Sequence, residues 1–251
     1  MNCINELKAI NSILPIFFLY SFLASCDIQY PLNDTSDRSE KLIIRNKGIT
    51  ELSKEVTEQK SLKYLDLFGN ELQTLPEDIN NLSSLKTLIL SKNHIQFLPS
   101  TIGQLKELKY LLLKHNELEV LPSEIGNLTN LSELDLRYNK LREIPPEIGN
   151  LISLEFLYLG ENELTLLPKE IGRLMNLKYL YVGRNHLTKL PWEIGNLTSL
   201  IELDISKSGN IIDIPESIRH LRNLEILYVN QSAIIPYSIR KENPRLKIVI
   251  R

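Results

Sequence analysis

Apolar residues recur along most of this chain in a pattern that restarts every 23 residues. The unit is clearest at 62–84, LKYLDLFGNELQTLPEDINNLSS, and its pattern is LxxLxLxxNxLxxLPxxIxxLxx. A fixed period in the twenties predicts a solenoid, in which each repeat buries its apolar side chains against the repeats beside it. The unit begins again at Leu85, Leu108, Leu131, Leu154, Leu177 and Leu200.

The LxL segment of each repeat alternates apolar and variable residues, which predicts a short strand. Stacked side by side, these strands are expected to form a parallel sheet on the inner side of a curve. One asparagine follows each strand, and its amide can both donate to and accept from backbone groups of its own and the neighbouring repeat. These residues therefore predict a hydrogen-bonded ladder through Asn70, Asn93, Asn116, Asn139, Asn162 and Asn185.

The second half of each repeat carries a proline and then an isoleucine three residues later. Proline has a fixed φ angle and no N–H, so it suits the opening of a short helical or 3₁₀ segment. The sequence thus predicts an α/β repeat solenoid, with strands on the concave side and short helical segments on the convex side. The prolines are Pro76, Pro99, Pro122, Pro145, Pro168 and Pro191.

The repeats at the two ends are irregular, as is expected where one side of a solenoid faces water. Residues 39–61 match the pattern with Lys47 in the asparagine position, and we interpret them as an N-terminal cap repeat. Six regular repeats cover 62–199. Residues 200–251 form irregular repeats and a C-terminal cap, with Ser208 in the asparagine position and one extra residue before Ile212.

The first 26 residues have a different character. Ile13–Ala24 is an apolar run of 12 residues, too short for a membrane span of about 20 but typical of a signal peptide. The run ends in LASC, which resembles a bacterial lipobox, and this resemblance implies a signal peptide (1–25) and an acylated Cys26. Residues 26–38 are polar and are interpreted as a tether. The alternative is an N-terminal cap helix.

Composition excludes several function classes. The net charge is −2 and the pI is about 6.1, so no basic field is available for nucleic acid. The only cysteines, Cys3 and Cys26, precede the repeats, and the histidines lack partners at ligand spacing, so we expect neither metal nor cofactor. Glu133 and Asp135, like Glu202 with Asp204, share a face of an open sheet, where water would reach them. We interpret them as a solvated acidic face, not as catalytic pairs, and expect neither enzymatic activity nor a small-molecule substrate.

Aromatic residues gather at the strand positions that face away from the core. Six of the ten tyrosines are there, and Phe156, Tyr158, Tyr179 and Tyr181 are expected to form one patch because neighbouring strands lie about 4.8 Å apart. Tyrosine is enriched in interface hot spots, although cross-strand packing alone would also place aromatic residues here. The predicted protein-binding residues are Tyr64, Asp66, Phe68, Tyr110, Lys114, Asp135, Arg137, Phe156, Tyr158, Tyr179, Tyr181, Asp204 and Tyr228.

The LPxxIGxL segments, such as those beginning at Leu121, Ile144, Leu167 and Leu190, resemble the 23-residue class of leucine-rich repeats. This class includes bacterial leucine-rich repeat lipoproteins and intracellular Ras-group scaffolds, and the resemblance implies protein binding through the concave sheet. Two hypotheses follow. The chain is an exported, lipid-anchored binding protein, which the LASC segment favours, or an intracellular scaffold without lipid. A catalytic effector would need a further domain.

Overall fold

The computed structural model describes residues 40–209 and 213–251, which belong to one compact unit extending from Arg38 to Arg251. The predicted signal peptide (1–25), the predicted lipidation site Cys26 and the tether (26–38) lie outside the described residues. The described part of the chain is therefore the repeat unit.

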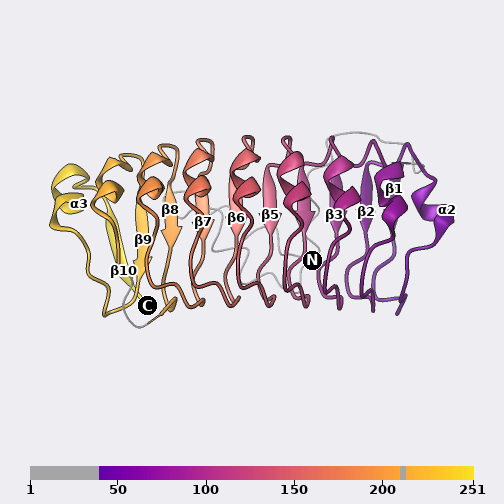
Figure 1. The fold of residues 1–251 in the computed structure, drawn as a ribbon, viewed down its shortest axis with the longest axis horizontal. Helices are drawn as coiled ribbons and strands as arrows, with labels where there is room; N and C mark the ends of the chain where they lie inside the picture. The colour runs from indigo at the N-terminus through magenta and orange to yellow at the C-terminus, as the bar shows by residue number, and fades with distance from the viewer. Residues whose placement is uncertain (1–39, 210–212) are drawn as a thin grey trace, which may run out of the picture. The chain divides into compact units, whose positions relative to one another are not determined.

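The repeat unit contains one sheet of ten parallel strands, and each strand pairs with the strands before and after it in sequence. Figure 1 shows the strands following one another in chain order, from indigo to yellow. The predicted open parallel sheet is thus confirmed. The strands are β1 (Lys41–Ile43), β2 (Tyr64–Asp66), β3 (Thr87–Ile89), β4 (Tyr110–Leu112), β5 (Glu133–Asp135), β6 (Phe156–Tyr158), β7 (Tyr179–Tyr181), β8 (Glu202–Asp204), β9 (Ile226–Val229) and β10 (Lys247–Ile250).

In the sheet, each strand residue lies opposite the residue at the same repeat position in the neighbouring strand. Leu65 lies opposite Leu88, and Leu88 lies opposite Leu111. Because side chains alternate along a strand, the middle residue of each strand points into the core while its two neighbours point out of the opposite face. The middle leucines of β2 to β8 are fully buried, as are the isoleucines that follow the prolines, such as Ile79 and Ile102. One continuous apolar core therefore runs along the repeats.

Each regular repeat returns through a 3₁₀ helix, as the prolines predicted. Every one of these helices follows a proline whose φ lies near −65°, for example Pro122 at −66° and Pro145 at −63°. The helices are η2 (Glu77–Asn81), η3 (Ser100–Gln104), η4 (Ser123–Asn127), η5 (Pro146–Asn150), η6 (Lys169–Arg173), η7 (Trp192–Asn196) and η8 (Glu216–His220).

The predicted asparagine ladder is present in all six regular repeats. The amide nitrogen of Asn116 donates to the carbonyl oxygens of Leu90 and Leu113, each at 3.0 Å. Its Oδ1 accepts the N–H of Ile95, also at 3.0 Å. Each amide therefore joins two successive repeats, and the same three contacts recur at the other asparagines. In the irregular repeat, Ser208 Oγ donates to the carbonyl of Val182 at 2.7 Å.

The two ends depart from the repeat pattern as expected. At the start, β1 pairs with β2 in the regular register, and a short α-helix, α2 (Lys54–Thr57), takes the place of a 3₁₀ helix. Near the end, Glu202 pairs with Ile226, so the register between β8 and β9 contains one extra residue. The helix α3 (Tyr237–Glu242) then leads into the predicted final strand, β10. Within residues 40–209 and 213–251, no helix has the length and apolar character needed to cross a membrane.

Candidate protein-binding face

The side of the sheet that points away from the apolar core, here called the concave face, is formed by three positions of each repeat. These are the first and last residues of the strand and the second residue after it, for example Tyr64, Asp66 and Phe68 in the first regular repeat. At the last of these positions, the repeats of β6 and β7 carry Gly160 and Gly183. The backbone beside these two strands is therefore not covered by side chains of its own.

The aromatic patch predicted from the sequence is present on β6 and β7. The rings of Phe156 and Tyr179 stack with centroids 5.1 Å apart and planes 4° apart. The rings of Tyr158 and Tyr181 stack at 5.3 Å and 18°. The aromatic patch, meaning these four residues, is thus two parallel ring pairs held by the strand spacing.

A guanidinium group extends the aromatic patch toward the N-terminal repeats. Arg137 donates to both carboxylate oxygens of Asp135, at 2.9 and 2.6 Å. Its guanidinium carbon also lies 4.6 Å from the ring centroid of Tyr158. Bidentate pairing and ring stacking both fix the orientation of an arginine side chain. The predicted residues Asp135 and Arg137 therefore form an ion pair with each other, and this pair fixes the position of the Arg137 guanidinium.

The other two predicted aspartates are likewise held by arginines of the same face. The carboxylate of Asp66 is fully buried and lies 2.7 Å from the Arg45 guanidinium. Asp204 lies 3.5 Å from Arg251. Burial beside Asp66 raises the pKa of Tyr64 to about 12. Each of the three predicted aspartates therefore has an arginine partner within the fold.

The interpretation of Glu202 as part of a solvated acidic face is also wrong. Its side chain accepts a hydrogen bond from the Tyr181 hydroxyl at 2.5 Å, and only 3% of the residue is exposed. Burial, with a smaller contribution from the Asp135 carboxylate, raises the pKa of Glu133 to about 7. The concave face therefore shifts the pKa of one carboxyl group, although the sheet is open.

A group of basic side chains lies just after β3 and β4, beside the aromatic patch, and most of it was missed from the sequence. The ammonium of Lys92 lies 5.2 Å from the Phe68 ring centroid, and that of Lys114 lies 5.3 Å from the ring of Tyr138. His115 stacks on Tyr138 at 4.2 Å. Lys114 had been predicted, whereas Lys92, His115 and Tyr138 lie one residue beyond the positions considered.

The predicted residues thus fall into three groups along the sheet, not into one continuous site. Tyr64, Asp66 and Phe68 are at the N-terminal end, where Lys41 and Arg45 lie over the two rings. The aromatic patch, with Lys114, Asp135 and Arg137 beside it, is central, and Tyr110 lies on β4 next to this group. Asp204 and Tyr228 are at the C-terminal end, where the Arg251 guanidinium lies 3.7 Å from the Tyr228 ring centroid.

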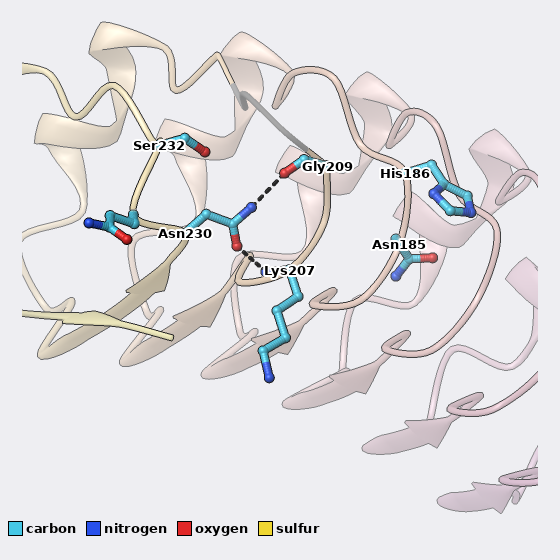
Figure 2. A pocket seen from close by; sticks show the side chains of 7 residues that line it. Asn185, His186, Lys207, Gly209, Asn230 and Ser232 are labelled. Carbon is cyan, nitrogen blue, oxygen red and sulfur yellow. Dashed lines mark hydrogen bonds between the residues drawn. The ribbon is translucent and has the colours of Figure 1, made fainter.

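A hollow lies beside the turn that follows β8, and its lining includes Asn185, Lys207 and Asn230 (Figure 2). Asn230 crosses this turn, donating to the carbonyl of Gly209 and accepting the N–H of Lys207. The side chain of His186 lies at the far rim. These contacts brace an irregular turn, since both amide groups of Asn230 bond to backbone. Across the residues that the structure describes, no three His, Cys, Asp or Glu side chains are grouped to hold a metal ion.

Comparison with known proteins gives the same fold. A family model described as a leucine-rich repeat region matches residues 45–136, 102–175 and 167–242. A search of curated proteins found no match. Among solved structures, a leucine-rich repeat protein of Leptospira interrogans, LIC12759, is 38% identical with a TM-score of 0.64, over 82% of this chain and 59% of that one.

Two further structures extend the comparison. A TDR receptor is 28% identical with a TM-score of 0.70, over 80% of this chain and 36% of its own. The leucine-rich repeat domain of the type III effector XopL has a TM-score of 0.75 at 24% identity, over 84% of this chain and 76% of that domain, and shows the fold alone. The chain spans little more than half of LIC12759. The repeated pattern, the asparagine ladder, the single parallel sheet and the family match together show that this chain belongs to the leucine-rich repeat family.

Proposed function

We propose that this chain is a protein-binding module that recognises its partner through the concave face. The observation that carries the proposal is the aromatic patch, two stacked ring pairs beside an oriented guanidinium on a rigid sheet. Tyrosine and arginine contribute large contact energies when they are held in place before binding, because little side-chain entropy is then lost. The PEPR1–AtPEP1 structure, 30% identical over 79% of this chain and 32% of that one with a TM-score of 0.60, supports partner binding in general.

We further propose that the module is exported and anchored by lipid at Cys26, with residues 26–38 as the tether. The support comes from the sequence alone, namely the 12-residue apolar run and the LASC segment. Each buried methylene of an acyl chain contributes about 0.8 kcal/mol, so two or more chains give stable anchoring. The intact mass of the protein from native membranes tests this. A chain starting at Cys26 with added acyl mass is expected, and an unprocessed soluble chain would leave the intracellular scaffold as the working model.

The binding proposal can be tested by site-specific photo-crosslinking in the native cell. A photoreactive residue replacing Tyr179 on the concave face is expected to capture one partner protein, identified by mass spectrometry. The control places the same residue at Phe97, which is 53% exposed and precedes η3. Capture from Phe97 but not from Tyr179 would move the interface off the concave face and contradict the proposal.

Alanine at both Tyr158 and Tyr179 is then expected to weaken binding of the captured partner at least tenfold, as is usual for hot-spot aromatics. This pair is preferable to Tyr158 with Tyr181, because loss of the Tyr181 hydroxyl would leave the buried Glu202 carboxylate without this donor. The melting temperature serves as the control. If stability falls sharply and affinity does not, the rings serve cross-strand packing instead.

A further inference from the structure

The basic side chains beside the aromatic patch have few negative groups near them among the residues that the structure describes. Lys92, Lys114 and His115, here called the basic cluster, lie with Arg137 across three neighbouring repeats. The carboxylate that acts on Lys114 and His115 is Asp135, and both oxygens of Asp135 are already bonded to Arg137. The basic cluster therefore holds positive charge that the described residues leave only partly balanced.

Burial, together with the neighbouring cations, lowers the pKa of both Lys114 and His115. The His115 imidazole is therefore mostly neutral at pH 7, and the positive charge is carried by Lys92, Lys114 and Arg137. Lys92 and Lys114 lie over the faces of Phe68 and Tyr138, which offset part of the repulsion through cation–π attraction. The rings also limit where the two ammonium groups can move. An anion arriving here would meet oriented donors and would relieve repulsion that the fold already contains.

We propose that the basic cluster is a subsite for an acidic side chain of the protein partner, next to the aromatic patch that receives an apolar or aromatic side chain. This inference rests on the proposed binding function of the concave face. Lys114 follows β4 and Tyr158 lies on β6, so the two subsites are two strand spacings apart, about 10 Å. An extended segment advances about 3.3 Å per residue. The preferred ligand is thus a peptide segment with Asp or Glu about three residues from an aromatic or large apolar residue.

Two features of the face bear on such a segment. Gly160 and Gly183 add no side chains of their own beside the aromatic patch, although the Asp204 carboxylate and the Ser206 carbonyl oxygen lie close to Gly183. The ammonium and imidazole groups of Lys92, Lys114 and His115 are compact donors that one carboxylate can satisfy together.

The test is selection of random 12-residue peptides, displayed on phage, against the full chain purified in detergent. Selected peptides are expected to carry a carboxylate about three residues from an aromatic residue. Their affinity should fall about tenfold when Lys92→Gln and Lys114→Gln are combined, and should weaken with added salt in the wild type more than in the variant. The matched control combines Lys169→Gln with Arg173→Gln, which removes the same charge from exposed positions of η6.

Charge reversal separates recognition from folding. Lys114→Glu should bind a selected peptide better when its acidic residue is replaced by lysine, whereas a merely misfolded variant would bind neither version. Peptides that depend on Tyr158 but not on Lys92 and Lys114 would overturn the acidic subsite and leave the concave-face proposal standing. If no peptide that depends on Tyr158 is selected, the proposed function fails as well.

Discussion

At the residue scale, stability depends on a few polar side chains that each complete a fixed set of contacts. Asn116 bonds to three backbone groups in two repeats and is buried. Glu133 shows the reverse situation, because burial disfavours its ionised form and raises its pKa to about 7. The same sheet therefore contains one polar side chain that stabilises the fold, Asn116, and one whose ionised form destabilises it, Glu133.

Asn116→Ala should lower the free energy of unfolding by about 2–4 kcal/mol, because it leaves buried backbone donors and acceptors without partners. Asn127→Ala is the matched control, since the Asn127 side chain is exposed at the end of η4. The control should change stability by less than about 0.5 kcal/mol. Guanidinium denaturation measures both, and equal losses would contradict a special role for the ladder.

Glu133→Gln should stabilise the protein at pH 8 and leave it unchanged near pH 4. The folded pKa of Glu133, about 7, lies above the ordinary value of 4.5, so the folded state holds a proton that the unfolded chain has lost. The stability that Glu133 contributes is therefore present below pH 4.5 and is lost as pH rises through about 7. Solvent screening limits the gain from the variant to about 1 kcal/mol. Melting temperatures at the two pH values measure it, and a gain of the same size at pH 4 would contradict the pKa argument. Glu143→Gln, at an exposed position, serves as the control.

At the element scale, the distance between neighbouring 3₁₀ helices is set by glycine. A β-carbon added at Gly149 in η5 would lie 2.5 Å from the Glu170 carbonyl oxygen in η6 and 2.9 Å from the Glu170 β-carbon. The same close approach recurs at Gly103, Gly126, Gly172 and Gly195. Packing between repeats requires these glycines. The Ile-Gly dipeptide that recurs in the repeats therefore marks a close contact between neighbouring 3₁₀ helices as well as a local turn.

Gly149→Ala is expected to destabilise the fold by about 1–3 kcal/mol through overpacking. Gly160→Ala is the comparison, because its added β-carbon would meet only the Gly183 carbonyl oxygen, at 3.1 Å. The loss at Gly160 should be less than half of that at Gly149. Thermal unfolding of both variants decides the matter, and the opposite order would show that the helices can move apart freely.

At the scale of the whole repeat unit, the packing of strands and helices joins each repeat mainly to its neighbours, so stability should be nearly additive along the solenoid. The unit has one parallel sheet and one continuous core, and each strand contacts the strands beside it in sequence. A whole repeat can thus be removed or replaced without unfolding the rest, provided that the strands on the two sides keep their register.

Deletion of residues 131–153, one complete repeat, should leave a folded protein with a lower denaturant m-value, since m scales with the surface exposed on unfolding. Deletion of 131–152 removes one residue fewer. The segments on the two sides of that deletion would be out of register, and a one-residue slip exchanges core and surface side chains. The shorter deletion should therefore unfold or precipitate, and circular dichroism with denaturant titration compares the two. Equal stability of both would contradict the fixed register.

The sequence by itself determined the repeat period, the parallel sheet, the 3₁₀ returns, the asparagine ladder and the ring pairs of the aromatic patch. It could do so because a fixed period places equivalent residues on adjacent strands, about 4.8 Å apart. Ser208 in the ladder and the extra residue after β8 followed from the same count. Only the tertiary structure decided which charges meet. Three features depend on the rotamers that polar and charged side chains adopt across the sheet: the pairing of Asp66 with Arg45, the burial of Glu202 and the basic cluster. The repeat period of the backbone does not fix those rotamers.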